Sequence, residues 1–390
     1  MYSVKVLRSA DEFEAIRSFW EDNAPHPNAE LEFYSTVIQS RSEIIRPHVI
    51  AISNDGQIVS LLVGRIERDH RRFRFGYMNL KIGKANSLVI VYGGCVGLWN
   101  TEIATLVSEE LSETLRRKEA AIIQLESLAE DAPLMLSIRQ ELVRHRPHRF
   151  EAPNRHWKMK VAESLEDFMK KFKSKQRTNL RRERKLYEEK YGEKSEFRCF
   201  TKEDDVIGLM DDIERVAKDS YHRRLGFGFM HNEETLNLMR LRARRGWLHT
   251  YVLYIDGISV AFWQGAAVNG TLYLGSTAYD NKISDCKPGK LVLQYMVEDL
   301  AANSDIREVD FGFGDAYYKK QFGDICWEEI SATIYSTSLP GLYFAGLEIG
   351  SAKAHHLALN TLNRFGGLEK VKKLWRNLGR TPKPSPATED

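Results

Sequence analysis

Apolar and polar residues follow one another in the first half of the chain with the periods of strands and amphipathic helices. Strands are predicted over 2–7, 48–53 and 57–66, and the Asn54-Asp55-Gly56 turn joins the last two as a hairpin. Further strands are predicted at 88–97 and 121–126, and helices at 11–20, 29–40, 101–117 and 131–144. The polar, Pro-bearing segment 147–155 then predicts a domain boundary.

The same order of elements starts again in the second half. A strand at 157–161, a long basic helical region at 164–191 and helices at 203–219 and 232–245 are predicted first. Three strands follow at 247–255, 258–268 and 271–279, joined by the hairpin turns Asp256-Gly257 and Asn269-Gly270. A helix from Pro288 to about 302, strands at 306–311 and 328–336, and a helical segment at 342–378 with a Pro-rich disordered end complete the prediction.

This repeated order predicts an α/β (α+β) fold of two tandem lobes followed by a helical tail. Each lobe is expected to hold a mixed, mostly antiparallel sheet flanked by helices. The predicted boundaries are 1–150 for the first lobe, 156–338 for the second lobe and 339–390 for the tail with its disordered end. No sequence repeat accompanies the repeated order.

Composition agrees with this size and excludes several classes of protein. The 390 residues are 43% hydrophobic and 28% charged, which is typical of a soluble globular protein with two domains. The net charge of +3 does not favour DNA binding. Four scattered cysteines without zinc spacing predict no metal site and free thiols in a reducing compartment. Without an apolar signal core or a long apolar span, we expect a cytoplasmic protein with no membrane insertion.

A candidate anion site lies at Lys287-Pro288-Gly289-Lys290, where a helix is predicted to begin. The first turn of a helix presents unpaired backbone N–H groups, and Gly allows a phosphate to approach closely. This pattern fits a pyrophosphate loop as well as it fits an ordinary helix start. In the first half, Gly93-Gly94 and Gly97 occupy a similar place without a following cation, which favours a structural role there.

The stretch VDFGFGDAYYKKQFGD, residues 309–324, gathers the chemistry that catalysis would need. Carboxylates (Asp310, Asp315), phenols (Tyr317, Tyr318) and a cation (Lys319) follow the predicted end of a strand. Its Asp-Phe-Gly triplet is not the kinase motif, because the chain contains no His-Arg-Asp triplet.

Two other segments are candidates for contacts with anions or substrate. Residues 170–190, KKFKSKQRTNLRRERKLYEEK, form the strongest charge run, which fits either a solvated helix face or a surface for a phosphate, an anionic substrate or tRNA. His222, Arg223 and Arg224 lie beside glycines in SYHRRLGFGFM, and we consider them candidate substrate contacts against a purely structural role.

The second half resembles the GNAT-superfamily acyltransferases of the cellulose-biosynthesis (CelD/BcsL-like) type, which are related to Fem-type peptidoglycan aminoacyltransferases. The matching segments cover about 165–330 and are, in order, FKSKQRTNLRRERK, SYHRRLGFGF, YVLYIDGISVAFWQG, LYLGSTAYD, PGKLVLQYMVEDL and VDFGFGDAYYKKQFGD. The first half resembles the family's degenerate first lobe in layout. The chain departs from ordinary GNAT enzymes, since it lacks their fuller Gly-rich acetyl-CoA signature.

The resemblance implies an acyl-CoA donor such as acetyl-CoA, with Pro288, Gly289 and Lys290 at its pyrophosphate. Acyl transfer needs a base, an oxyanion stabiliser and an acid for the leaving thiolate. Asp310 or Asp315 is the candidate base or orienting carboxylate, and Tyr317 or Tyr318 is the candidate acid. Lys319, taken from the matching Tyr-Lys, is the cation that would stabilise developing negative charge.

Three functions therefore remain open. The first is a CoA-dependent acyltransferase acting on a saccharide or small metabolite, such as an exopolysaccharide precursor. The second is a Fem-like aminoacyltransferase that uses aminoacyl-tRNA, for which the basic segment 170–190 is the argument. The third is a non-catalytic scaffold of a polysaccharide-synthesis complex.

Overall fold

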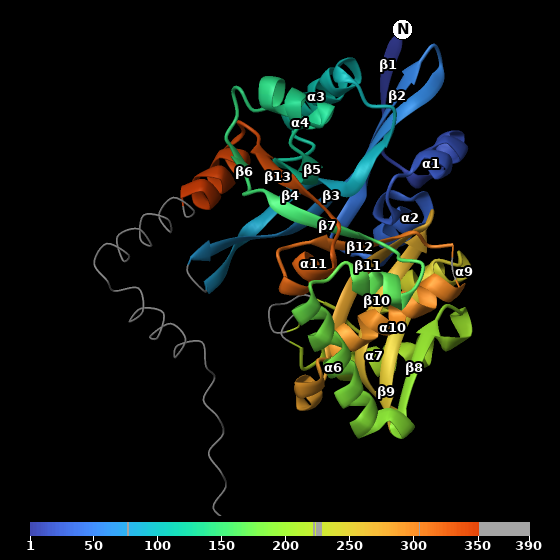
Figure 1. Ribbon diagram of the computed structural model, residues 1–390. Helices are drawn as coiled ribbons and strands as arrows, with labels where there is room; N and C mark the ends of the chain where they lie inside the picture. The colour runs from blue at the N-terminus through green and yellow to red at the C-terminus, as the bar shows by residue number, and fades with distance from the viewer. Residues whose placement is uncertain (76–77, 221–222, 224–227, 304, 351–390) are drawn as a thin grey trace, which may run out of the picture.

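The computed structural model describes residues 1–350 apart from 76–77, 221–222, 224–227 and 304. These residues form two lobes around one sheet of 13 strands (Figure 1). The strands are β1 (Tyr2–Leu7), β2 (Ile44–Asn54), β3 (Gln57–Phe75), β4 (Met78–Gly97), β5 (Ile122–Ala129), β6 (His148–Phe150), β7 (Asn154–Lys160), β8 (Ser195–Phe200), β9 (Leu248–Ile255), β10 (Ile258–Val268), β11 (Thr271–Tyr279), β12 (Glu308–Phe313) and β13 (Ile325–Tyr335).

Helices cover both faces of this sheet in each lobe. They are α1 (Arg17–Asn23), α2 (Leu31–Ser40), α3 (Thr101–Arg116), α4 (Pro133–Ser137), α5 (Leu165–Lys170), α6 (Ser174–Tyr191), α7 (Val206–Ala217), α9 (Glu233–Arg244), α10 (Pro288–Asn303) and α11 (Tyr317–Phe322). Short 3-10 turns occur at η1 (Ala10–Ile16), η2 (Pro27–Ala29), η4 (Gly192–Lys194), η5 (Glu203–Asp205) and η6 (Asn281–Cys286), and η3 (Ile138–Leu142) is a π-helical turn.

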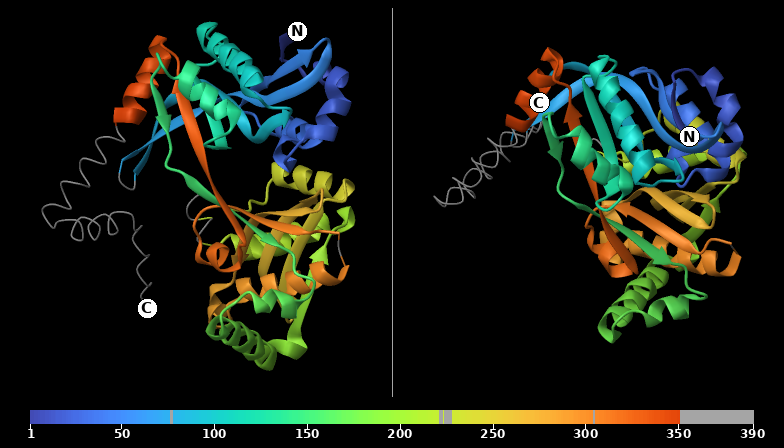
Figure 2. Two further views of the ribbon diagram at one scale, coloured as in Figure 1. Left: turned by 45° about the horizontal axis from the view of Figure 1, so that its top comes forward. Right: turned by 90° about the horizontal axis from the view of Figure 1, so that it is seen from above.

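The strand order is β1-β2-β3-β4-β5-β13-β7-β12-β11-β10-β9-β8, with β6 pairing on β13 as well. The late strand β13 therefore lies in the middle of the sheet. Its residues 329–335 pair with β5 of the first lobe, and its residues 325–329 pair with β7 of the second. Figure 2 shows β7 and β13 crossing together from one lobe to the other.

Each lobe contains a parallel strand pair connected by a helix. In the first lobe α3 connects β4 to β5, which pair in parallel over 87–90 and 122–125. In the second lobe α10 connects β11 to β12, which pair in parallel over 271–273 and 308–310. The other pairings within each lobe are antiparallel, so the predicted fold class of two tandem lobes with mixed sheets is confirmed. The exact lobe boundaries stay a prediction, since β13 pairs with both lobes.

Alternation along the strands builds a separate apolar core on each face. In the first lobe Val49 and Ala51 of β2 pack with Trp20 on the side of α1 and α2, while Ile50 and Ile52 pack on the side of α3. In the second lobe the core with α7 and α9 contains Val252 and Phe262, and the core with α6 and α10 contains Leu253 and Trp263. The fold is therefore a helix–sheet–helix sandwich in both lobes.

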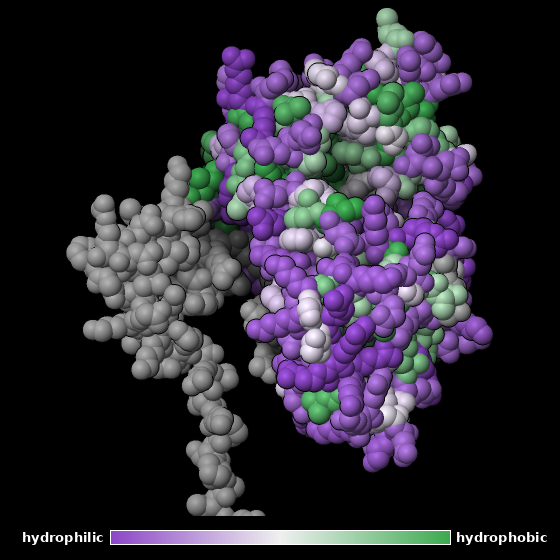
Figure 3. Space-filling model, viewed as in Figure 1, coloured by the Kyte–Doolittle hydropathy of each residue, from purple (hydrophilic) through white to green (hydrophobic). Residues whose placement is uncertain are grey.

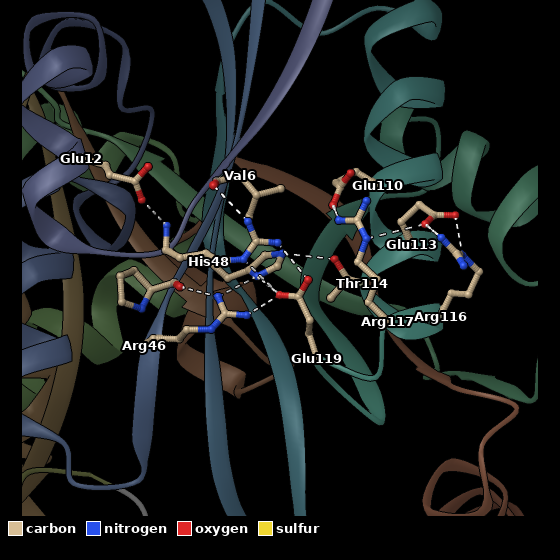
Figure 4. Close-up of polar contacts among 12 residues, drawn as sticks. Val6, Glu12, Arg46, His48, Glu110, Glu113, Thr114, Arg116, Arg117 and Glu119 are labelled. Carbon is tan, nitrogen blue, oxygen red and sulfur yellow. Dashed lines mark hydrogen bonds and ion pairs between the residues drawn. The ribbon is translucent and has the colours of Figure 1, made fainter.

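A polar network joins β1, β2 and α3 inside the first lobe (Figure 4). Glu119, just after α3, accepts hydrogen bonds from Arg8 at 2.9 Å and from Arg46 of β2 at 2.5 Å. The ring of His48 is fully buried beside them, with Nε2 3.3 Å from the Thr114 hydroxyl. Burial lowers the pKa of His48 to about 3, so its imidazole is neutral at pH 7.

Several elements differ from the sequence predictions. The strand β8 and the helix α11 were not predicted, and the basic helical region is divided into α5 and α6 at residues 171–173. Residues 339–350 of the predicted tail form a helix that packs on the first lobe through Phe344 and Ala345. There the buried carboxylate of Glu348 accepts hydrogen bonds from Arg71 and Tyr335. The rest of the predicted tail lies outside the described residues.

Candidate active site

A pocket of about 410 Å³ lies where α10 begins, in the second lobe. Lys287, Gly289 and Lys290 line it from the start of α10, and Thr277 and Tyr279 line it from the end of β11. Its wall also contains Trp263, Tyr317, Tyr318 and Phe322. Its size and its largely aromatic wall are typical of a small-molecule site.

The topology of β11 and β12 creates this pocket. The recorded pairing of these parallel strands ends at Tyr273 and Asp310. After that point β11 runs on to η6 and α10, while β12 turns away through Gly312 and Gly314. Both glycines have positive φ, +67° and +102°, which permits the sharp turn into α11. The helix α11 therefore begins near the place where the strands diverge, and its Tyr318 packs against Phe311 of β12.

The start of α10 has the features expected of an anion site. Lys287 adopts a left-handed conformation with φ +51°, Pro288 is the first helical residue, and Gly289 follows it in the first turn. A Cβ at Gly289 would lie 3.6 Å from the Tyr279 ring, an ordinary contact, so packing alone does not require glycine here. Lys290 is not free, because its Nζ lies 3.4 Å from the Glu183 carboxylate of α6.

The two tyrosines contribute differently to the pocket. Tyr317 is 69% exposed, whereas Tyr318 is partly buried against Trp263, with ring centroids 5.3 Å apart. Burial raises the pKa of Tyr318, which keeps its hydroxyl protonated at neutral pH. Tyr318 is therefore a proton donor held in the pocket wall.

The carboxylates of the 309–324 stretch lie away from this pocket. Asp315 is 48% exposed and forms ion pairs with Lys320 at 2.8 Å and Arg155 at 3.5 Å. The hydrogen bond from Lys320 lowers the pKa of Asp315. Asp310 is buried, and its Oδ1 accepts hydrogen bonds from His156 Nε2 at 2.6 Å and from the Gly312 amide at 2.7 Å.

Lys319 is buried beside Asp310 rather than exposed to the pocket. Its ammonium donates a hydrogen bond to the carbonyl of Phe313 at the end of β12. Burial lowers the pKa of Lys319 to about 8, and the charge of Asp310 opposes this shift. Lys319 thus connects α11 to β12 and places a positive charge at the diverging strands.

Residues 174–320 match the family model of the acetyltransferase (GNAT) domain. We refer to residues 174–320 as the GNAT domain, after the family model that they match. The match contains the diverging strands β11 and β12, the start of α10, and Tyr317 and Tyr318, so it includes most of the pocket wall. The general part of the resemblance, to GNAT acyltransferases, is therefore confirmed.

Solved structures resemble the whole arrangement of lobes. FemX superposes with a TM-score of 0.57 at 10% identity, over 86% of this chain and 98% of the FemX chain. A conserved protein of unknown function from Bacteroides thetaiotaomicron VPI-5482 gives 0.51 at 11% identity, over 86% and 100%. A tandem GNAT protein from the clavulanic acid biosynthesis pathway gives 0.48 at 10% identity, over 87% and 99%. At such identities the first two similarities show the fold alone, and no curated protein matches the chain in sequence.

The arginine cluster that follows α7 lies partly outside the described residues, which do not include His222 or Arg224. Arg223 donates hydrogen bonds to Glu214 of α7 at 2.6 Å and to the Phe229 carbonyl. Both contacts stabilise the end of α7. Of this part of the chain, Asp219 and Ser220, which precede the cluster, are among the residues that line the pocket.

The basic helix α6 combines ion pairs with exposed cations. Arg181 pairs with Glu166 at 3.1 Å, and Arg184 pairs with Glu298 at 2.8 Å. Lys175, Arg177 and Arg182 form no ion pair with any residue that the structure describes. Figure 3 shows the strongly hydrophilic surface of this part of the GNAT domain. The segment is thus partly a paired helix face and partly a basic surface.

Within residues 1–350, apart from the gaps given above, no group of three or more His, Cys, Asp or Glu side chains could hold a metal ion. Among the helices of that same part, none has the length and apolar character needed to cross a membrane.

Several residues at or near the candidate site were not predicted from the sequence. Trp263 and Glu183 reach the pocket region from β10 and α6, and His156 approaches Asp310 from β7. Single polar residues in these elements carry no local pattern that distinguishes them. Only the pairing of β7 with β12 brings His156, which precedes Asp310 by 154 residues, to that carboxylate.

Proposed function

We propose that the chain is an acyl-CoA-dependent acyltransferase, with acetyl-CoA as the donor and a saccharide or small metabolite as the acceptor. The observation that carries this proposal is the pocket that contains both the start of α10 and the α11 tyrosines. One end offers backbone N–H groups and lysines for a pyrophosphate, and the other offers a protonated phenol. The match to the acetyltransferase (GNAT) domain supports the same reaction class.

The residues have distinct roles in the proposed transfer. Backbone N–H groups at the start of α10, with Lys287 and Lys290, bind the donor's phosphates. Aromatic side chains, among them Trp263, exclude water around the thioester. The acceptor attacks the thioester carbonyl, and Tyr318 donates its proton to the departing sulfur. Lys319 holds the end of β12 in place and adds positive charge beside the developing oxyanion.

A role in exopolysaccharide or cellulose biosynthesis and a cytoplasmic location are also part of the proposal. The biosynthetic role comes from the sequence resemblance to the CelD/BcsL-like type. The location is supported by the four cysteines, Cys95, Cys199, Cys286 and Cys326, which are all free thiols in the structure.

Calorimetric titration with acetyl-CoA tests the donor. We expect micromolar binding that weakens about tenfold in Lys287→Glu and in Lys290→Glu, because each change places a carboxylate beside the phosphates. Glu183→Gln should tighten binding several-fold, since it releases Lys290 from its ion pair. Lys202→Glu, an exposed lysine outside the pocket, should bind as the wild type does. A wild-type protein that binds no CoA thioester would contradict the proposal.

A Fem-like aminoacyltransferase that uses aminoacyl-tRNA is the second candidate. The exposed cations of α6, Lys175 and Arg182 among them, favour it because they are available to phosphates. If acetyl-CoA does not bind, titration with charged tRNA at increasing salt is the next measurement. A steep loss of affinity with salt that is weakened in Arg182→Glu would support this function.

A further inference from the structure

A second cluster of polar side chains lies where the two lobes meet, outside the pocket described above. Tyr92 of β4 comes from the first lobe, His156 of β7 and Asp310 of β12 come from the second, and Glu329 comes from β13. Four strands that are distant in sequence therefore supply one group of residues. Neither the sequence motifs nor the family match assigns a role to Tyr92, His156 or Glu329.

The hydrogen bonds of His156 define its protonation. Its Nε2 lies 2.6 Å from Asp310 Oδ1, an atom that also accepts the Gly312 amide hydrogen, so Nε2 carries the proton. Its Nδ1 is then a free base, and the Tyr92 hydroxyl lies 3.3 Å from it. The imidazole of His156 can therefore accept a proton from the Tyr92 hydroxyl, while the Asp310 carboxylate fixes its orientation.

Aromatic rings hold this imidazole in place. The ring of Trp327 stacks on it at 4.3 Å with an interplanar angle of 12°, and Phe313 meets it edge-on at 4.6 Å. His156 is 1% exposed, whereas Tyr92, Phe313 and Trp327 each keep some exposed surface. The buried imidazole can therefore exchange a proton with a ligand only through a neighbour, and Tyr92 is the neighbour at its free nitrogen.

The surroundings of the Glu329 carboxylate indicate that a ligand binds here. Its Oε1 accepts a hydrogen bond from Trp327 Nε1 at 2.6 Å and lies 3.9 Å from His156 Nδ1. Its Oε2 is buried and makes no hydrogen bond of good geometry with the described residues, although the Tyr92 hydroxyl lies close enough to interact with this carboxylate. An unpaired buried carboxylate oxygen is costly unless a donor supplies the missing bond. Aromatic rings beside a carboxylate suit an ammonium group in particular.

This cluster lies across β12 from the donor pocket. Phe311 points to the pocket side, where its ring contacts Trp263 and Tyr318. Asp310, the preceding residue, points to the opposite side and reaches His156. Asp310 is also the last residue of β12 that pairs with β11. A thioester that enters between the diverging strands would thus lie between Tyr318 and the cluster.

We propose that this junction between the lobes holds the acceptor amine, the usual acceptor of GNAT acetyltransferases, and that Tyr92, His156 and Asp310 form the relay that removes its proton. The inference rests on the proposed function and adds the place of the acceptor site and the residues of both lobes that form it. Tyr92 and Glu329 contact the amine and are catalytic residues. His156 and Asp310 act through Tyr92 and are positioning residues.

Each proton of the ammonium group has a defined acceptor in the proposed transfer. The ammonium gives its first proton to Glu329, and the free amine attacks the thioester carbonyl. As the C–N bond forms, the second proton passes to the Tyr92 oxygen while the Tyr92 proton moves to His156 Nδ1. The C–S bond breaks, and Tyr318 donates a proton to the sulfur. Of the two protons then held by Glu329 and His156, one returns to Tyr318 and the other is released. The products are an amide, CoA thiol and one proton.

Release of CoA thiol from acetyl-CoA, with D-glucosamine and ethanolamine as amine probes, tests the relay. We expect Tyr92→Phe and His156→Gln to lower kcat about 100-fold or more while the acetyl-CoA Kd stays unchanged. Glu329→Gln should mainly raise the KM for the amine. The conservative Tyr92→Phe keeps the ring packing, so it tests the hydroxyl even if His156→Gln fails to fold. Exposed His145→Gln and Tyr343→Phe are the matched controls that should retain activity.

A pH profile separates the relay from a structural role. Asp310, Glu329, Tyr92 and, through Tyr92, His26 are the titratable groups that face His156. The wild-type rate should rise with pH, because the relay has to accept a proton from the amine, and this rise should be smaller in His156→Gln. Retention of kcat within threefold in Tyr92→Phe would overturn the inference. So would a wild type that binds acetyl-CoA but releases no CoA to either amine or to water. A failure to bind acetyl-CoA would instead count against the proposed function.

Discussion

Tyr317 and Tyr318 are neighbours in the chain, but their surroundings differ. Both side chains line the donor pocket, yet only Tyr318 is held by contacts with Trp263 and Phe311. A proton donor must keep a constant position relative to the departing sulfur, which a 69% exposed side chain such as Tyr317 does not do. The structure therefore favours Tyr318 as the acid between two residues that the sequence left equivalent.

Tyr318→Phe should lower kcat for CoA release by about 10–100-fold, because the leaving thiolate loses its proton donor. Tyr317→Phe, the matched control, should stay within about threefold of the wild type, in line with the small effects typical of exposed positions. Steady-state kinetics at saturating acetyl-CoA measure both. The reverse result, with Tyr317→Phe the impaired variant, would assign the acid to Tyr317.

At the scale of elements, buried histidines connect strands to their neighbours. His48 of β2 lies under the end of α3, and His26 at η2 meets Tyr92 of β4 edge-on at 4.6 Å. A Cβ on Gly93 would lie 2.4 Å from the His26 Cβ, so glycine there serves close packing, as the sequence favoured. Burial lowers the pKa of His26 to about 4, as it lowers that of His48 to about 3.

These two histidines should make the fold less stable in acid. In the unfolded chain they titrate near pH 6.5, whereas in the folded chain they stay neutral to much lower pH, so the unfolded state binds more protons. Their contribution is present above about pH 6.5 and is lost as pH falls toward 4. We expect a loss on the order of 1–2 kcal/mol per histidine between pH 7 and pH 5.

Urea unfolding at pH 7 and at pH 5 measures this loss. His48→Gln should show a smaller difference between the two pH values than the wild type, whatever its stability at pH 7. His145→Gln, at an exposed position, should keep the wild-type difference. An unchanged difference in His48→Gln would show that His48 does not contribute to the acid sensitivity.

At the scale of the whole molecule, the lobes share one sheet rather than merely touching. One end of β13 pairs with β5 of the first lobe, and its other end pairs with β7 of the second. The lobes also meet at α2 and α9, where Arg41 forms an ion pair with Glu234 at 2.7 Å. Phe33, Val37 and Leu241 form a small apolar cluster beside that pair. Loss of packing in one lobe should therefore also weaken the strand pairing of the other lobe.

Ile334→Ala tests this coupling, because Ile334 of β13 is fully buried in the first lobe's core. The change should cost about 2–5 kcal/mol and lower the unfolding temperature of both lobes together. Differential scanning calorimetry should show one transition in the wild type and one in the variant. Leu339→Ala, at a position 85% exposed, is the control that should leave the transition in place. Two separate transitions would show that the lobes unfold independently.

The sequence by itself determined the local structure of this protein. The turns at Asp55-Gly56, Asp256-Gly257 and Asn269-Gly270 formed as predicted, because both residues of each turn adopt the positive φ that these residue types permit. Most helices followed from apolar spacing, and Pro288-Gly289 marked the start of α10 correctly. The general resemblance to GNAT acyltransferases was also recognisable from the sequence, and residues 174–320 match the acetyltransferase (GNAT) family model.

Only the tertiary structure decided which of those residues meet. The stretch 309–324 gave no indication that Tyr318 and Asp310 lie on opposite sides of β12, because a glycine-rich turn hides the alternation. Nor could it indicate Tyr92 or Glu329, which approach through pairings between distant strands. Such pairings depend on the free energy of burying whole sheet faces. Local sequence patterns do not specify which distant strands become neighbours in the sheet.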